Sequence, residues 1–160
     1  MHKAVVVALG LLLVGCGRGE GGDDARGNTA AGVSQTAAAE GLAGLYEGAG
    51  EGARRNRMCI VPGAGAQPRF GLIAWGQGDR NCTMAGEARR SGNALRLEAD
   101  PECVFEARME GTAITMPEQL PQGCAYYCGP GASLGGAGYG KTPGGDPQAA
   151  IDLAGDPLCG

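Results

Sequence analysis

The chain has 160 residues, with 13 lysines and arginines against 17 acidic residues, and therefore a formal net charge of −4. An acidic chain without a basic stripe is a poor candidate for binding nucleic acid. Glycine accounts for 32 residues and proline for 9, which brings the composition close to that of low-complexity proteins and leaves room for one small domain with a modest core.

The N-terminus has the features of a signal peptide. A short basic start, His2 and Lys3, precedes an apolar run over residues 4–15. This run is shorter than the roughly 20 residues that a membrane-spanning helix needs. Its length and its basic flank are typical of a secretory signal, which would occupy residues 1–15.

The apolar run ends in Leu13-Val14-Gly15-Cys16, which resembles the lipobox of bacterial lipoproteins. The resemblance covers the first 16 residues and implies cleavage before Cys16 and its acylation, with palmitate among the acyl chains; an ordinary secretory signal is the alternative. Several chains, at about 0.8 kcal/mol per buried CH₂, anchor a protein where one chain does not. Because Gly17 and not aspartate follows the cysteine, the family analogy favours the outer membrane of a Gram-negative bacterium, facing the periplasm.

Composition divides the remaining chain into three parts. Residues 16–44 contain mostly glycine, alanine and small polar residues, and we expect a flexible tether because they have little to bury. Residues 45–128 have the pattern of a β domain. Residues 129–160 form a Gly/Pro-rich C-terminal loop region that a disulfide should tie to the domain.

Short segments of alternating polarity run through the β domain, as expected for half-buried antiparallel strands. In residues 94–99, for example, two leucines alternate with an arginine and a glutamate. The expected strands cover residues 45–47, 57–62, 69–76, 82–90, 94–99, 103–110 and 113–117.

Tight-turn sequences at 91–93, 100–102 and 110–112 connect these segments, so each strand should lie beside its predecessor. The predicted fold is all-β: a small, disulfide-stapled antiparallel meander of seven or eight strands, closed as a barrel or folded as a sandwich. Residues 148–155 are a weak helix candidate.

Alternation also assigns faces. Trp75 is expected in the core, and Asp79 with Arg80 is expected to make a local turn contact. The expected inner faces of residues 82–90 and 94–99 carry Met84, Ala88, Leu95 and Leu97, and one face of residues 103–110 carries Cys103, Phe105, Ala107 and Met109.

Six cysteines follow Cys16, and an even count in an exported chain predicts three disulfides. They are Cys59, Cys82, Cys103, Cys124, Cys128 and Cys159. A metal site is the rival interpretation. The spacing of Cys124 and Cys128 is not the usual C-x₂-C, and cleavage of the signal would remove the only histidine, so we expect no metal.

The hairpin of residues 82–90 and 94–99 suggests one pairing. In one register Arg90 pairs with Asn93, and in the other Arg90 pairs with Leu95. The second register sets Cys82 opposite Cys103, and the first leaves both near the same base of the hairpin. We therefore predict a Cys82–Cys103 disulfide.

Cys124 and Cys128 are too close in the sequence to bond to each other on one helical turn. Each should therefore have a distant partner. The remaining predicted pairs are Cys59–Cys124 and Cys128–Cys159.

Residues 135–142, GGAGYGKT, match the P-loop pattern G-x-x-x-x-G-K-[ST]. A P-loop joins a buried strand to a helix whose N-terminus binds phosphate. Here prolines and glycines lie on both sides and would interrupt that helix in its first turns. We expect no nucleotide and no other cofactor, and interpret residues 129–145 as a flexible surface loop or as a loop that contacts a partner.

Four side chains in or beside this loop are candidates for binding a partner: Tyr126, Tyr127, Tyr139 and Lys141. Tyrosine is favoured at interfaces because it is large, stiff and amphipathic. Alternatively, Tyr126 and Tyr127 plug one end of a barrel.

Catalysis is not expected. Without histidine in the mature chain, Ser-His-Asp and Cys-His arrangements are excluded. Glu98, Asp100 and Glu102 cluster near one turn, where acids are usually solvated. A minor hydrolase is therefore the weakest of the functions considered.

In size, anchor, cysteines and strand pattern the chain resembles small periplasmic lipoproteins such as the membrane-bound lysozyme inhibitors. That resemblance implies a non-catalytic binding module on the membrane, with a protein or envelope partner, which inhibits a hydrolase such as a lysozyme. Their inhibitory loop motif has no match here. The alternative is a structural or assembly accessory of the outer membrane.

Overall fold

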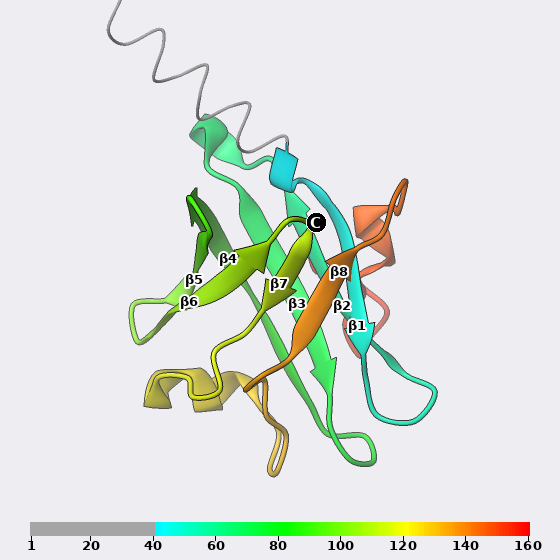
Figure 1. Cartoon of the computed structure of the whole chain (residues 1–160). Helices are drawn as coiled ribbons and strands as arrows, with labels where there is room; N and C mark the ends of the chain where they lie inside the picture. Colours follow the sequence, from blue (N-terminus) through cyan, green and yellow to red (C-terminus); the bar gives the residue numbers. More distant parts are fainter. Residues whose placement is uncertain (1–40) are drawn as a thin grey trace, which may run out of the picture.

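Eight antiparallel strands close into a barrel in the computed structural model, which describes residues 41–160 (Figure 1). Every strand lies beside its predecessor in the sequence, and β8 closes the barrel against β1. The strands are β1 (Gly44–Ala49), β2 (Arg55–Val61), β3 (Arg69–Trp75), β4 (Asn81–Ser91), β5 (Ala94–Asp100), β6 (Cys103–Glu110), β7 (Ala113–Thr115) and β8 (Gly138–Lys141). The predicted meander is confirmed, and of the two architectures the barrel is the one that forms.

The signal peptide, the lipobox and all but the end of the predicted tether lie outside the described residues. Within residues 41–160, no helix has the length and apolar character needed to cross a bilayer. The helical elements of residues 41–160 are a short turn at Gly41 and three 3₁₀ turns: η1 (Ala64–Ala66), η2 (Gln122–Tyr127) and η3 (Pro147–Ala149).

Strand β8 lies inside the segment that the sequence placed in a loop region. Tyr139 pairs with Ile114 of β7, and Lys141 pairs with Tyr46 of β1. With two glycines among four residues, β8 has a weak strand signal. It forms because β1 and β7 would otherwise each leave an edge of unpaired backbone groups.

The two halves of β4 have different neighbours. Residues 81–87 pair with β3, whereas only residues 87–91 pair with β5. At Gly86, just before the part that pairs with β5, an added Cβ would meet the Glu98 carbonyl oxygen at 2.0 Å. Glycine is therefore required where the backbone of β5 approaches β4. Arg90 pairs with Leu95, which is the second of the two predicted registers.

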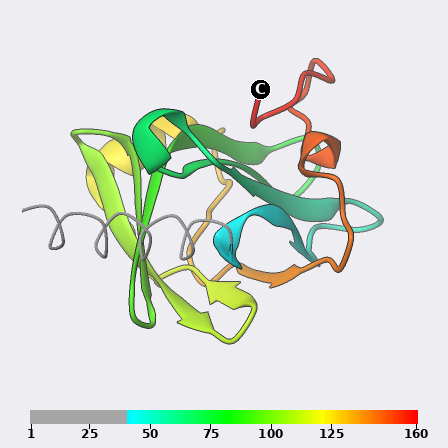
Figure 2. The same cartoon turned by 90° about the horizontal axis from the view of Figure 1, so that it is seen from above.

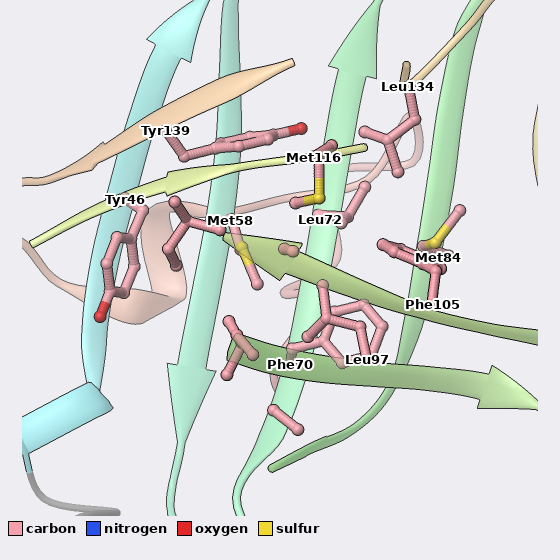
Figure 3. Packing of buried hydrophobic residues seen from close by; sticks show 14 of the residues in the cluster. Tyr46, Met58, Phe70, Leu72, Met84, Leu97, Phe105, Met116, Leu134 and Tyr139 are labelled. Atoms are coloured by element: carbon pink, nitrogen blue, oxygen red, sulfur yellow. The ribbon is translucent and has the colours of Figure 1, made fainter. Parts of the chain in front are cut away.

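The core fills the barrel with side chains from every strand (Figure 3). All eight residues assigned to the apolar faces of residues 82–90, 94–99 and 103–110 are buried, at 5% exposure or less. Burying one large apolar side chain stabilises a fold by about 1.5–3 kcal/mol, so this interior is the main source of stability.

A second, smaller cluster lies outside the barrel wall, where the C-terminal segment covers β1, β2 and β3 (Figure 2). Leu45 and Cys59 point outward from their strands and pack with Ala150 and Cys159. The chain passes so close to β3 that a Cβ at Gly71 would lie 2.5 Å from the Leu158 carbonyl oxygen. This cover explains why β3 is apolar on both faces.

The predicted helix over residues 148–155 is wrong beyond its first turn. Asp146 caps η3 by accepting a hydrogen bond from the Gln148 N–H. The Asp152 carboxylate then accepts hydrogen bonds from the Ala154 and Asp156 N–H groups at 2.8 and 2.9 Å. These bonds close a turn, and the side chain thereby competes with a continued helix.

Three disulfides form, as predicted, but all three predicted pairs are wrong. The bonds are Cys59–Cys159, Cys82–Cys128 and Cys103–Cys124. Residues 81–86 of β4 pair with β3 and not with β5, so Cys82 sits opposite Ala74 and away from Cys103. The predicted pair required β4 and β5 to stay together along their whole length, which they do not.

Candidate partner-binding site

The loops of the barrel lie at its two ends, and one end also holds the turn η2 and two of the three disulfides. The connections β1–β2, β3–β4 and β7–β8 lie at the lower end in Figure 1, together with η2; we call this the distal end. The β5–β6 turn lies beside η2, because Glu102 is packed against Gly123. The segment that leads into β1, where the described residues begin, lies at the opposite end (Figure 1). The distal end therefore faces away from the point where the N-terminal part of the chain joins the barrel.

Two disulfides fix η2 to the barrel. Cys124, within the turn, bonds to Cys103 on β6, and Cys128, directly after it, bonds to Cys82 on β4. The N–H of Gly129 also donates to the Asn81 carbonyl at 2.8 Å. The turn is thus attached to two separate strands and forms a rigid platform.

Tyr127 adds a third attachment. Its hydroxyl donates to Asp100 Oδ2 at 2.6 Å, while Asp100 Oδ1 accepts from the N–H groups of Glu102 at 2.7 Å and Cys103 at 2.9 Å. The hydrogen bond from Tyr127, and after it the backbone bonds, lower the pKa of the Asp100 carboxyl. The same bond raises the pKa of Tyr127. Tyr127 also packs against the core.

Tyr126, in contrast, points into solvent. It is 89% exposed, and its ring meets the Tyr127 ring edge-on with 5.4 Å between centroids. The alternative that both tyrosines plug one end of the barrel is therefore wrong for Tyr126, whereas Tyr127 packs against the core. Tyr126 is the only aromatic residue among the exposed large apolar side chains of residues 41–160.

A cleft of about 420 Å³ opens beside this platform. Its apolar lining includes Met84, Leu120 and Leu134, together with Cys124 and Cys128 of the two disulfides. Its polar side chains are those of Glu118, Gln122 and Ser133. The platform and the segment after it thus form the walls of a cavity at the distal end.

The two other predicted partner-binding residues lie elsewhere. Tyr139 is only 2% exposed and points into the barrel (Figure 3), and burial raises its pKa. The Lys141 ammonium donates to the Gly41 carbonyl at 3.0 Å, at the end opposite to η2. Tyr139 therefore cannot be presented to a partner. Because β8 was not expected, neither was the alternation that turns its tyrosine inward.

The segment that matches the P-loop pattern has a different conformation. Residues 135–137 form part of a turn, and residues 138–141 are β8. Lys141 thus stands in a strand between β1 and β7, where a P-loop lysine would begin a helix.

Trp75 is half-buried on the outside of the barrel, so its expected place in the core is wrong. The Arg54 guanidinium lies over its ring, 4.5 Å from the centroid, and also pairs with Asp79. The expected local contact between Asp79 and Arg80 is thus replaced by one with the β1–β2 loop. Ala74 points into the barrel, so the side chain of the next residue, Trp75, points outward at the end of β3.

The three acids near the β5–β6 turn do not converge on one point. Glu98 pairs with Arg96 at 2.8 Å, and Asp100 binds Tyr127. Within residues 41–160, no three histidine, cysteine or acidic side chains form a group that could hold a metal ion.

Comparison of the chain with protein-family models, curated proteins and solved structures finds no match. The signal for the platform in the sequence was the pair of cysteines that bracket two adjacent tyrosines. Glu118 and the cleft carried no recognisable signal.

Proposed function

We propose that the protein is a non-catalytic binding module of the cell envelope, anchored by lipid to the outer membrane, which contacts a protein partner through its distal end. The observation that carries this proposal is Tyr126, 89% exposed on a turn that is fixed by two disulfides.

Exposed tyrosine on a rigid base is favourable for binding. Binding that immobilises a mobile side chain costs about 0.5–1.5 kcal/mol in entropy. A backbone that is already rigid removes the further cost of ordering the turn. Tyrosine contributes large contact area for two side-chain torsions, which is why it dominates many binding surfaces. An apolar cleft beside it offers a place for a partner side chain.

The orientation of the barrel agrees with this role. The segment that leads into β1 lies at the end opposite to η2 (Figure 1), so the predicted lipid anchor and Tyr126 belong to opposite ends of the barrel. A partner in the periplasm could then reach the platform without contact with lipid. Inhibition of a hydrolase such as a lysozyme is one activity that such a module would have.

A structural accessory of the outer membrane is the second candidate. Ile151 and Leu153, 39% and 67% exposed, favour it because apolar side chains of this kind can contact other envelope proteins. Both residues lie on the C-terminal segment. A partner strand could not add to the barrel itself, because the eight strands leave no unpaired edge.

Photo-cross-linking in cells tests the first candidate. A photoreactive phenylalanine at Tyr126 should give a discrete adduct with an envelope protein, because that side chain would lie in the interface. The same residue at Glu106, exposed on β6, is the matched control and should give none. The proposal is wrong if Tyr126 yields no adduct, or if adducts form at Glu106 and around Leu153 instead. Purified partner, or a lysozyme, is then assayed for inhibition.

A further inference from the structure

The cleft beside Tyr126 contains a single ionic group. Residues 111–140 form most of its lining, and Glu118 is the only charged residue in that stretch. Met84, the lining residue outside the stretch, is apolar. The cleft therefore combines apolar and neutral polar side chains with one negative charge.

The carboxylate of Glu118 has a defined place. A Cβ at Gly136 would lie 3.0 Å from Oε1 and 3.1 Å from Oε2, so the carboxylate rests against this glycine, whose φ of 69° is in the left-handed region. Arg80 reaches the rim at another point, against Gly131. No ion pair within residues 41–160 includes Glu118.

We propose that this cleft receives a lysine or arginine side chain of the protein partner. The cationic head pairs with Glu118, the aliphatic stem lies along the partly exposed Leu120, and Tyr126 packs on the partner surface around it. Long basic side chains combine an apolar stem with a charged head, which matches an apolar wall with one carboxylate. The inference rests on the proposed function, because it names what the distal end recognises.

A second acid lies at the edge of the platform. Glu102 is exposed beside η2, and a Cβ at Gly123 would lie 2.7 Å from its Cβ. A partner that places a cation in the cleft therefore meets a second acid at the edge of the platform. Complementary charge of this kind determines which partner is selected more than how tightly it binds.

NMR titration tests the inference on the oxidised mature chain carrying Cys16→Ala. The probes are N-acetyl-arginine methylamide and the citrulline analogue, which has nearly the same shape without the charge. We expect the arginine probe to shift the amide signals of Gln122, Ser133 and Leu134 saturably. The citrulline probe should bind about two- to fivefold more weakly, the effect of one partly exposed ion pair.

Two variants identify the group responsible. In Glu118→Gln the two probes should bind equally, whereas Glu106→Gln, with the same charge change on the side of the barrel, should keep the difference. Unchanged signals outside the cleft show that both variants are folded. Equal binding of the probes to the parent protein, no shift in the cleft, or a difference that survives Glu118→Gln would overturn the inference. Cross-linking at Tyr126 together with any of these results would leave the proposed function standing and remove only the basic side chain.

Discussion

Cys59 and Cys159, which lie 100 residues apart in the sequence, form the disulfide that binds the C-terminal segment to the outer face of β2. The bond lies within the small apolar cluster with Leu45 and Ala150. The end of the chain is thereby part of the barrel wall, and its covalent attachment should matter for stability.

Replacing Cys59 and Cys159 together by alanine should lower the free energy of unfolding by about 5 kcal/mol, because the bond closes a long loop in the unfolded chain. Replacing Cys103 and Cys124, with a sequence separation of 21, should cost about 3 kcal/mol. Denaturant unfolding of both double variants measures the difference. An equal or reversed order would contradict the loop-closure argument.

Gly86→Ala should destabilise the barrel by about 1–3 kcal/mol, since the new methyl group would collide with the backbone of β5. Gly138→Ala on β8 is the control: nothing lies within 4 Å of its Cβ position, and the change should be close to neutral. Thermal unfolding compares the two. If both variants melt at the same temperature as the parent, the close approach at Gly86 is not a constraint.

Tyr139→Phe should leave stability unchanged or raise it by about 1 kcal/mol, because the buried hydroxyl has no hydrogen-bond partner among residues 41–160. Phenylalanine keeps the ring and removes the cost of the unpaired group. Urea unfolding provides the measurement, with Tyr46→Phe as control: that hydroxyl donates to the Leu42 carbonyl at 2.6 Å, so its loss should destabilise. Destabilisation by Tyr139→Phe would show that its hydroxyl has a partner.

Tyr127→Phe should raise the pKa of Asp100, because it removes the first cause of the lowered value. A carboxyl with a depressed folded pKa contributes stability above its unfolded pKa of about 3.9 and loses it as the pH falls through the folded value. The variant should therefore lose less stability on acidification than the parent. NMR titration of the Asp100 carboxyl carbon gives the shift directly, and identical titration curves would refute the coupling.

Cys16→Ala should release the protein from membranes, because the lipobox resemblance places the acyl chains on that residue. Without acyl chains the mature protein has no membrane anchor. Fractionation of cells into soluble and membrane parts measures the effect. A variant that sediments with membranes as the parent does would contradict acylation at Cys16.

The alternation of apolar and polar residues along the chain predicted most of the fold. Leu95 and Leu97 alternate with charged residues, and both are buried where the pattern placed them. A short turn such as residues 91–93 forces the two strands that it joins to lie side by side. The meander could therefore be predicted from the sequence, and the pairing of Arg90 with Leu95 was one of the two registers considered. The even number of cysteines likewise predicted three disulfides.

The tertiary structure alone decided the features that depend on contacts between distant segments. β8 exists because two edges needed a partner, and no local pattern marks its four residues. The cysteine partners depend on where the pairing of β4 with β5 stops, and the exposure of Tyr126 depends on which strands its flanking disulfides reach. Glu118 shares a cleft with Met84 only because the barrel closes, since nothing along the chain relates a residue after β7 to one on β4.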